Sequence, residues 1–122
     1  MDIIVTGATG FLGTSLCATL EAQGHSVTRL SSQNCDLTRP DSLDRFDRQR
    51  YEQIYHLAAW TQAGDFCLYH PAEQWIINQQ INTNVLTWWQ AHQPQAKLIC
   101  MGSSCAYDPS YELVEENYLS GM

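Results

Sequence analysis

Short apolar blocks recur along the chain, and their composition predicts strands. The blocks at residues 2–6, 26–30, 53–57 and 97–101 are rich in branched side chains, as buried strands of a parallel sheet are. Segments with a helical period lie between the first two blocks and between the last two. Strands that alternate with helices predict an α/β fold with a parallel sheet and right-handed crossover connections.

Two segments repeat their apolar residues with the spacing of a helix. Leu12, Leu16 and Leu20 recur at intervals of four and predict a helix with one apolar stripe, which ends near Gly24. A longer helix is predicted from residue 71 to near residue 94. Its apolar stripe consists of Ile77, Ile81, Val85 and Trp89.

Polar and aromatic residues also mark the longer helix. Asn78 and Asn82 are predicted to lie away from its apolar stripe. Trp75, Trp88 and Trp89 leave two alternatives: they expose apolar surface that promotes self-association, or they cover the sheet.

The segment after the second predicted strand is short for a doubly wound fold. Residues 31–37 are polar and too few to hold both a helix and a full strand, which an ordinary doubly wound unit would place there. Pro40 and Asp41 predict the start of a short helix over residues 42–49. We therefore expect a Rossmann-like, doubly wound parallel sheet that is abbreviated at this point.

Three glycines occupy the turn between the first strand and the first helix, spaced Gly7-x-x-Gly10-x-x-Gly13. Such a turn leaves backbone N–H groups free at a helix N-terminus, where the helix dipole favours an anion. Gly7 permits the tight turn, Gly10 lets a pyrophosphate approach the backbone, and Gly13 lets the helix pack closely on the strand. The spacing is not the commoner Gly-x-Gly-x-x-Gly, but the strand–turn–helix context favours a dinucleotide site over a purely structural turn.

Polar residues after the strands are further candidates, because ligands of parallel sheets bind beyond the carboxyl ends of the strands. An acidic residue after the second strand would accept from the ribose of NAD and repel the extra phosphate of NADP. This chain has Ser31 and Ser32 there, with Arg29 nearby, which favours NADP over NAD. Asp36 is either a turn residue or a partner for the adenine amino group.

A hydroxyl and a thiol follow the last predicted strand. In an alternating arrangement Ser103 and Cys105 point the same way, which suits polarising a carbonyl and moving a proton. The alternative is a loop of small residues without a chemical role.

Composition excludes several classes of partner. The 122 residues suffice for one domain with a core. Thirteen acidic residues against six basic ones give a net charge of −7, which argues against nucleic acid or an anionic membrane as partner. The five cysteines form no Cys-x-x-Cys pair and the four histidines have no metal spacing. We expect reduced thiols in a cytoplasmic protein, no metal site and no membrane span.

Four motifs follow one another in a recognisable order: Thr-Gly-Ala-Thr-Gly-Phe-Leu-Gly at 6–13, Asp-Leu at 36–37, His-Leu-Ala-Ala at 56–59 and Ser-Ser-Cys-Ala-Tyr at 103–107. In this order they resemble the extended short-chain dehydrogenase/reductases, the NAD(P)-dependent sugar epimerase/dehydratase family. Within that family, residues 82–86 and 101–109 are most similar to the GDP-L-fucose synthases, which are epimerase-reductases.

The resemblance implies a role for each motif. The pyrophosphate would lie on the glycine turn and on backbone N–H groups of the following residues: Gly7, Gly10, Phe11, Leu12 and Gly13. Asp36 and Leu37 would bracket the adenine. The path to the nicotinamide would be lined by Leu57, Ala58 and Ala59. Ser103 would hydrogen-bond the reacting sugar oxygen, and Cys105 would act as acid or base in epimerisation.

The chain departs from the family in one respect, because it contains no Tyr-x-x-x-Lys. The positions four residues after Tyr107, Tyr111 and Tyr118 hold Tyr111, Glu115 and Met122. The resemblance therefore implies that residues 1–122 are the N-terminal NAD(P)-binding Rossmann portion, without the substrate domain.

Two functions follow as hypotheses. In the first, the chain is the cofactor-binding part of an NAD(P)-dependent sugar-nucleotide epimerase or reductase, inactive alone, whose full-length parent binds a nucleotide-sugar and forms a homodimer. In the second, it is a naturally short, non-enzymatic module that binds NAD(P) as a sensor or contacts a partner protein. Further native codons that encode Tyr-x-x-x-Lys would favour the first.

Overall fold

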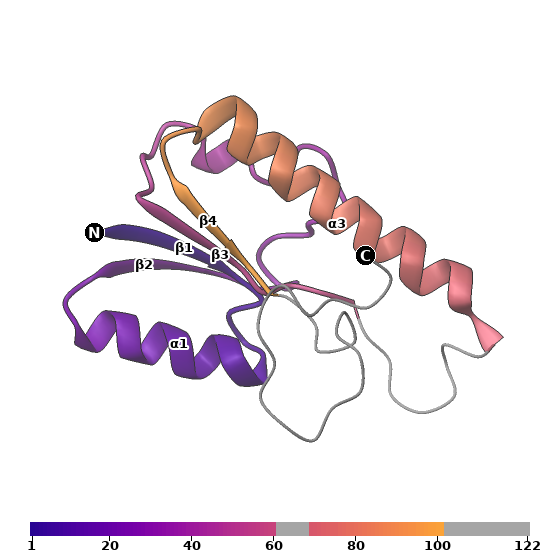
Figure 1. Cartoon of the computed structure of the whole chain (residues 1–122), viewed down its shortest axis with the longest axis horizontal. Coiled ribbons are helices and arrows are strands. Elements are labelled where there is room, and N and C mark those ends of the chain that lie inside the picture. Colours follow the sequence, from indigo (N-terminus) through magenta and orange to yellow (C-terminus); the bar gives the residue numbers. More distant parts are fainter. Residues whose placement is uncertain (61–68, 102–122) are drawn as a thin grey trace, which may run out of the picture.

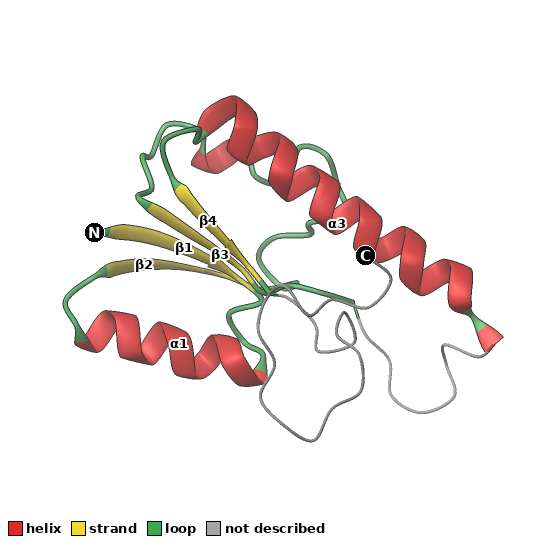
Figure 2. Ribbon diagram, in the orientation of Figure 1, coloured by secondary structure: helices red, strands yellow, loops and turns green. Residues whose placement is uncertain are grey.

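The computed structural model, in which residues 1–60 and 69–101 are described, contains a parallel sheet between two layers of helix (Figures 1 and 2). The strands are β1 (Asp2–Thr6), β2 (Ser26–Leu30), β3 (Gln53–His56) and β4 (Lys97–Cys100), in the order β2-β1-β3-β4. The helices are α1 (Phe11–Ala22), a short 3₁₀ helix η1 (Asp44–Phe46) and α3 (Pro71–His92). The predicted α/β class, the parallel Rossmann-like sheet and its four strands are confirmed.

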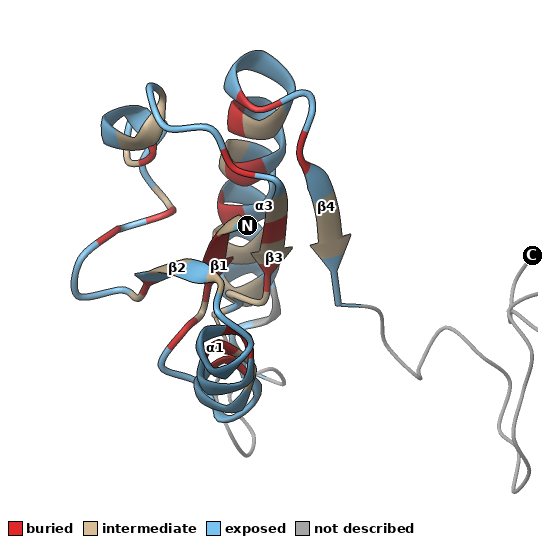
Figure 3. Cartoon of the chain, turned by 90° about the vertical axis from the view of Figure 1, so that its left-hand side faces the viewer, coloured by how far each residue is buried: buried red, intermediate tan, exposed pale blue. Residues whose placement is uncertain are grey.

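Alternation along β1 divides the apolar interior into two layers. Ile3 and Val5 point to one face and pack with Cys17 of α1, whereas Ile4 points to the other and belongs to the cluster that α3 covers. Each of these β1 side chains is at most 1% exposed. Figure 3 shows the buried residues concentrated where the two helices face the sheet. β1 is thus the centre of the fold, and its C-terminal end is fixed from both sides.

The buried face of α1 contains two of the three predicted leucines, because Leu20 is buried and Leu16 packs against the same cluster. Gly13, Cys17 and Leu20 are buried, whereas Leu12 is 45% exposed. Gly13 lies in close contact with the turn after β1, so the first turn of the helix faces the sheet at this residue. The helix ends as predicted before Gly24, whose φ of 90° is the left-handed conformation that glycine adopts readily.

The tryptophans of α3 divide between the two predicted alternatives. Trp88 is 5% exposed and packs in the core, whereas Trp75 is 71% exposed. Ile81 and Val85 form the buried stripe as predicted. Neither α1 nor α3, within the part of the chain that the structure describes, is long and apolar enough to cross a membrane.

The segment between β2 and β3 contains no regular helix beyond η1 within residues 31–52. The predicted short helix over 42–49 is present only as η1 and flanking turns, because the N–H groups bond three residues back, as from Phe46 to Leu43. Side chains of α3 and of the residue after it hold this segment in place. Trp88 Nε1 donates to Asp47, and the buried Gln93 accepts from the Tyr51 N–H while donating to the Gln49 carbonyl. Loops are therefore held where an ordinary doubly wound fold has another helix and strand.

Candidate functional site

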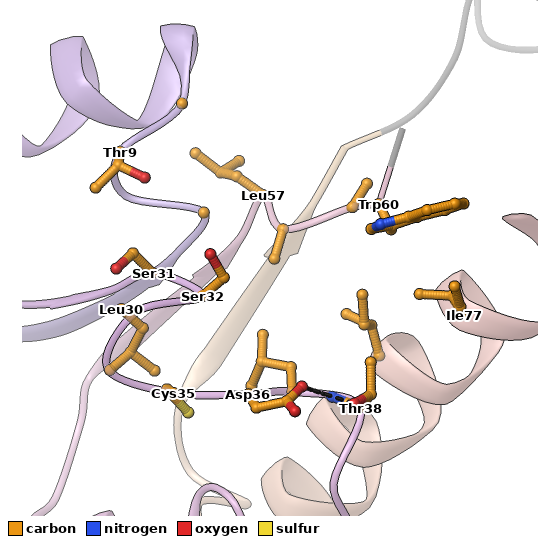
Figure 4. A pocket seen from close by; sticks show the side chains of 16 residues that line it. Thr9, Leu30, Ser31, Ser32, Cys35, Asp36, Thr38, Leu57, Trp60 and Ile77 are labelled. Atoms are coloured by element: carbon orange, nitrogen blue, oxygen red, sulfur yellow. Dashed lines mark hydrogen bonds between the residues drawn. The ribbon is translucent and has the colours of Figure 1, made fainter. Parts of the chain in front are cut away.

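A cavity of about 450 Å³ opens at the carboxyl edge of the sheet, between the glycine turn, the loops after β2 and β3, and α3 (Figure 4). It brings together most of the residues predicted to bind a cofactor: Gly7, Gly10, Ser31, Ser32, Asp36, Leu37, Leu57, Ala58 and Ala59. The three others, Phe11, Leu12 and Gly13, form the first turn of α1 and do not line the cavity themselves. Ser103 and Cys105 lie outside the described residues.

Sequence reasoning missed several residues that line the same cavity: Thr9, Leu30, Cys35, Thr38, Trp60, Ile77 and Ile81. Ile77 and Ile81 belong to the predicted stripe of α3 and continue past the sheet edge to form the apolar side of the cavity. Trp60 follows the His-Leu-Ala-Ala motif directly, and this position is the signal that could have identified it. Figure 4 shows Trp60 and Ile77 on neighbouring sides of the space.

The three glycines of the turn meet different requirements. Gly7 has a φ of 67°, and a Cβ there would lie 2.8 Å from the Ala58 nitrogen. A Cβ at Gly13 would overlap the Gly7 carbonyl oxygen and lie 2.9 Å from the Ala8 Cα. A Cβ at Gly10 would have one neighbour within 4 Å, the Gly7 oxygen at 3.4 Å. Gly7 and Gly13 are therefore needed by the fold, whereas Gly10 leaves space that the fold itself does not need.

The N-terminus of α1 is suited to an anion. Its N-cap, Gly10, has no side chain that could occupy the helix end, and the first turn contains no acidic residue. The Thr14 N–H donates to the Gly10 carbonyl. The N–H groups of Phe11, Leu12 and Gly13 come before the first such bond of the helix, so they are available to a ligand at this end of the cavity.

A carboxylate lies farther along the cavity wall. Asp36 Oδ1 accepts from the Thr38 hydroxyl at 2.6 Å and from the Thr38 N–H at 3.1 Å. These two bonds, the hydroxyl first, hold the pKa of the Asp36 carboxyl below its usual range. The bonds form a turn in which Asp36 is exposed (Figure 4). Asp36 is thus both a turn residue and an oriented, ionised acceptor in the cavity.

The loop after β2 presents hydroxyl groups and no free cation. Ser31 follows β2 as the register predicted, and Asn34 accepts from its N–H while donating to the Arg29 carbonyl. The Arg29 guanidinium pairs with Glu21 of α1, with Nε 2.7 Å from Oε1. Arg29 does not line the cavity, so Ser31 and Ser32 are the polar side chains at this position.

Three asparagines of α3 fix the walls of the cavity. Asn78 accepts from the Trp60 N–H at 2.7 Å and donates to the Trp60 carbonyl at 2.9 Å. Asn84 donates to the Leu37 carbonyl at 2.8 Å, and Asn82 Oδ1 lies 2.9 Å from His56 Nε2. The sequence indicated only that Asn78 and Asn82 lie off the apolar stripe. In the structure Asn78 holds the loop after β3 by hydrogen bonds, and Asn82 contacts the His56 ring at the end of β3.

His56 predicts a pH dependence of stability. The ring is 7% exposed, and burial lowers its pKa, an effect that the bond to Asn82 partly offsets. A histidine whose pKa is lowered on folding stabilises the protein above the ordinary pKa of about 6.5 and loses this contribution as the pH falls through the folded value. The free energy of unfolding should therefore fall below about pH 6.5, by at most about 1.4 kcal/mol per pH unit.

Urea unfolding at a series of pH values measures this effect. His56→Gln should remove this part of the slope, and His92→Gln, a change at an exposed ring, should leave it. An unchanged slope in His56→Gln would contradict the assignment.

Comparisons with known proteins agree with this arrangement. Residues 3–121 match the NAD dependent epimerase/dehydratase family. A curated relative, the dTDP-4-dehydrorhamnose reductase of Mycolicibacterium smegmatis, is 38% identical over 60 residues, which are 49% of this chain and 18% of that protein.

Solved structures share the fold over nearly the whole chain. A GDP-L-fucose synthetase from Naegleria fowleri bound to NADP aligns with a TM-score of 0.76 at 25% identity, over 98% of this chain and 36% of that one. The UDP-glucose 4-epimerase of Thermus thermophilus in complex with NAD aligns with a TM-score of 0.81 at 22% identity, over 98% and 44%. The second likeness concerns the fold alone. The chain thus spans less than half the length of these relatives.

Proposed function

This chain belongs to the NAD dependent epimerase/dehydratase family, and from this membership we propose that residues 1–122 form an NAD(P)-binding unit of a sugar-nucleotide epimerase or reductase. One observation carries the proposal. A single cavity joins a helix N-terminus with space at Gly10 to an oriented carboxylate at Asp36, as an elongated anionic ligand with a purine at one end requires.

Each part of a dinucleotide has a group of described residues that would bind it. Backbone N–H groups of Phe11, Leu12 and Gly13 would hold the pyrophosphate beside Gly10. Ser31 and Ser32 would meet the adenosine ribose, while Asp36 and Leu37 would bracket the adenine. The nicotinamide would extend along Leu57, Ala58 and Ala59.

The parent reaction would be hydride transfer at a sugar carbon. The nicotinamide supplies or accepts the hydride when it is bound. Ser103 would hydrogen-bond the sugar oxygen and Cys105 would move a proton, as the family resemblance implies. Because these 122 residues contain no Tyr-x-x-x-Lys, we expect them to bind NAD(P) without turnover. The homodimer implied by the resemblance stays a prediction.

Titration with NADPH and NADH, followed by nicotinamide fluorescence, tests the proposal. Two serines after β2 and no acidic side chain at that point favour tighter binding of NADPH. The absence of binding by either dinucleotide would overturn the proposed function.

Asp36 makes a further prediction about the adenine end. Its carboxylate accepts from an amino group but repels a carbonyl, so NAD should bind about tenfold more tightly than nicotinamide hypoxanthine dinucleotide, in which a carbonyl replaces the amino group. Asp36→Asn should reduce this preference, because an amide can also donate. Thr38→Ala, which keeps the carboxylate, should retain the preference. Equal affinities of the unsubstituted protein for both dinucleotides would place the adenine elsewhere.

A further inference from the structure

A buried hydroxyl joins the first strand to the wall of the cavity. Thr6 and His56 are partners in the register of β1 and β3, and both side chains lie on the face that α3 covers. Thr6 Oγ1 lies 3.0 Å from the backbone nitrogens of Leu57 and Ala58, and both N–H groups donate to it. A hydroxyl oxygen has two acceptor positions, so these two bonds use both of them.

The Thr6 proton therefore has one partner left. His56 Nδ1 lies 2.7 Å from Oγ1, and because the oxygen already accepts twice, Thr6 donates and Nδ1 accepts. A neutral ring whose Nδ1 accepts carries its proton on Nε2, which then donates to Asn82 Oδ1 at 2.9 Å. Each bond in the series Asn82–His56–Thr6 therefore has one direction: Thr6 donates to His56 Nδ1, and His56 Nε2 donates to Asn82 Oδ1.

The series ends at the wall of the proposed cofactor cavity. Leu57, Ala58 and Ala59 line that cavity, and the Ala58 backbone packs so closely on Gly7 that a Cβ on Gly7 would lie 2.8 Å from the Ala58 nitrogen. The two N–H groups bound by Thr6 belong to this wall. The position of the wall against the glycine turn therefore depends on the Thr6 hydroxyl accepting both.

We propose that His56 is a positioning residue for dinucleotide binding: its neutral, Nε2-protonated ring, held by Asn82, orients the Thr6 hydroxyl so that it holds the 57–59 wall against the glycine turn. The inference rests on the proposed function of the cavity. A second proton on His56 would place an N–H at Nδ1, opposite an oxygen whose acceptor positions are both used. The bond to Thr6 would then be lost, or a wall N–H would lose its acceptor.

Among the described residues, the surroundings of the ring contain no charged group that would favour that second proton. From β1 the ring meets Thr6, from β4 its register partner is Cys100, and from α3 the amide of Asn82 contacts it. Asn78 and Leu86 of α3 line the same small cavity as the ring. None of these described neighbours is a carboxylate or a cation, so a charge introduced at residue 82 would be a new influence on the ring.

The test introduces that charge without changing the shape of the side chain. Asn82→Asp keeps an acceptor for Nε2 but favours the doubly protonated ring. NADPH and NADH affinities are measured at about pH 8 and about pH 6, on either side of the ordinary histidine pKa. The unsubstituted protein should bind almost equally at both. Asn82→Asp should bind normally at the higher pH and about tenfold more weakly at the lower one, where about a tenth of the molecules keep the neutral ring.

Controls separate this role from a general effect of charge or folding. Gln90→Glu makes the same amide-to-carboxylate change at an exposed position of α3 and should show no pH-dependent loss of affinity. The ¹⁵N shifts of the His56 ring should show Nε2 protonated and Nδ1 unprotonated in the unsubstituted protein, and both protonated in Asn82→Asp at the lower pH.

Three results would each have a distinct meaning. A protonated Nδ1 in the unsubstituted protein at about pH 8 would overturn the assigned series. A charged ring in Asn82→Asp with undiminished affinity would overturn the positioning role. Failure of the unsubstituted protein to bind any dinucleotide would overturn the proposed function and with it the role in binding, while the ring shifts would still decide the hydrogen-bond series.

Discussion

Gly13→Ala should lower the free energy of unfolding by more than about 4 kcal/mol, a large part of the roughly 5–15 kcal/mol that stabilises a domain. The added methyl would overlap the Gly7 carbonyl oxygen and lie 2.9 Å from the Ala8 Cα. Both neighbours are backbone atoms of the turn that joins β1 to α1, so no side chain can rotate to make room. Relief would require α1 to move away from β1, which would expose Ile3 and Val5.

Urea unfolding followed by circular dichroism measures this effect, and Gly24→Ala is the matched control. Gly24 also has a special backbone conformation, with a φ of 90°, but a Cβ there would have no neighbour within 4 Å. Gly24→Ala should therefore cost only about 1 kcal/mol, from backbone strain alone. A Gly13→Ala protein as stable as Gly24→Ala would show that α1 does not need its close approach to β1.

The strands could be predicted from the sequence because a short apolar block bounded by turn residues is enough to define each of them. Residues 2–6 and 26–30 are short apolar blocks between turn residues, and the structure has strands with these same bounds. The other two strands end one residue earlier than predicted. A parallel sheet then follows from the alternation with helices, and it places the loops after the strands at one edge.

Helix orientation and the segment between β2 and β3 could not be predicted, because tertiary contacts decide them. The leucine spacing of α1 indicated a stripe through Leu12, but Leu12 is 45% exposed and Gly13 contacts the turn instead. The residues after Asp36 have helix-start signals, yet Trp88 and Gln93 hold them as turns from a distance of more than 40 positions in the chain. Local propensity gives way to partners that no window of sequence contains.

The candidate site was predictable at the glycine turn, where backbone geometry requires glycine at Gly7 and Gly13. The hydrogen bonds that hold the walls of the cavity could not be predicted. Asn78, Asn82 and Asn84 are polar residues on a helix and could as well face solvent. What identifies their role is the set of groups opposite them, namely the backbone of Trp60 and Leu37 and the ring of His56. The site therefore combines a turn readable in sequence with walls held by tertiary hydrogen bonds.

Gly10→Ala should separate ligand binding from folding. Gly10 has a φ of −74° and a ψ of 177°, which alanine adopts without strain, and its Cβ would meet only the Gly7 oxygen, at 3.4 Å. The free energy of unfolding should fall by no more than about 1 kcal/mol, the cost of alanine at an N-cap. The methyl would instead stand beside the free N–H groups of α1, where the pyrophosphate is proposed to lie.

The affinity for NADPH and NADH should then fall by about 100-fold, because overfilling a close-packed contact costs up to about 3 kcal/mol. Fluorescence titration beside urea unfolding of the same sample gives both quantities. Ser15→Ala, which changes an exposed side chain one turn into α1, should alter neither the affinity nor the stability by a comparable amount. A Gly10→Ala protein that folds and binds both dinucleotides with undiminished affinity would show that the pyrophosphate does not rest on this turn. The space at Gly10 would then have no part in holding a cofactor.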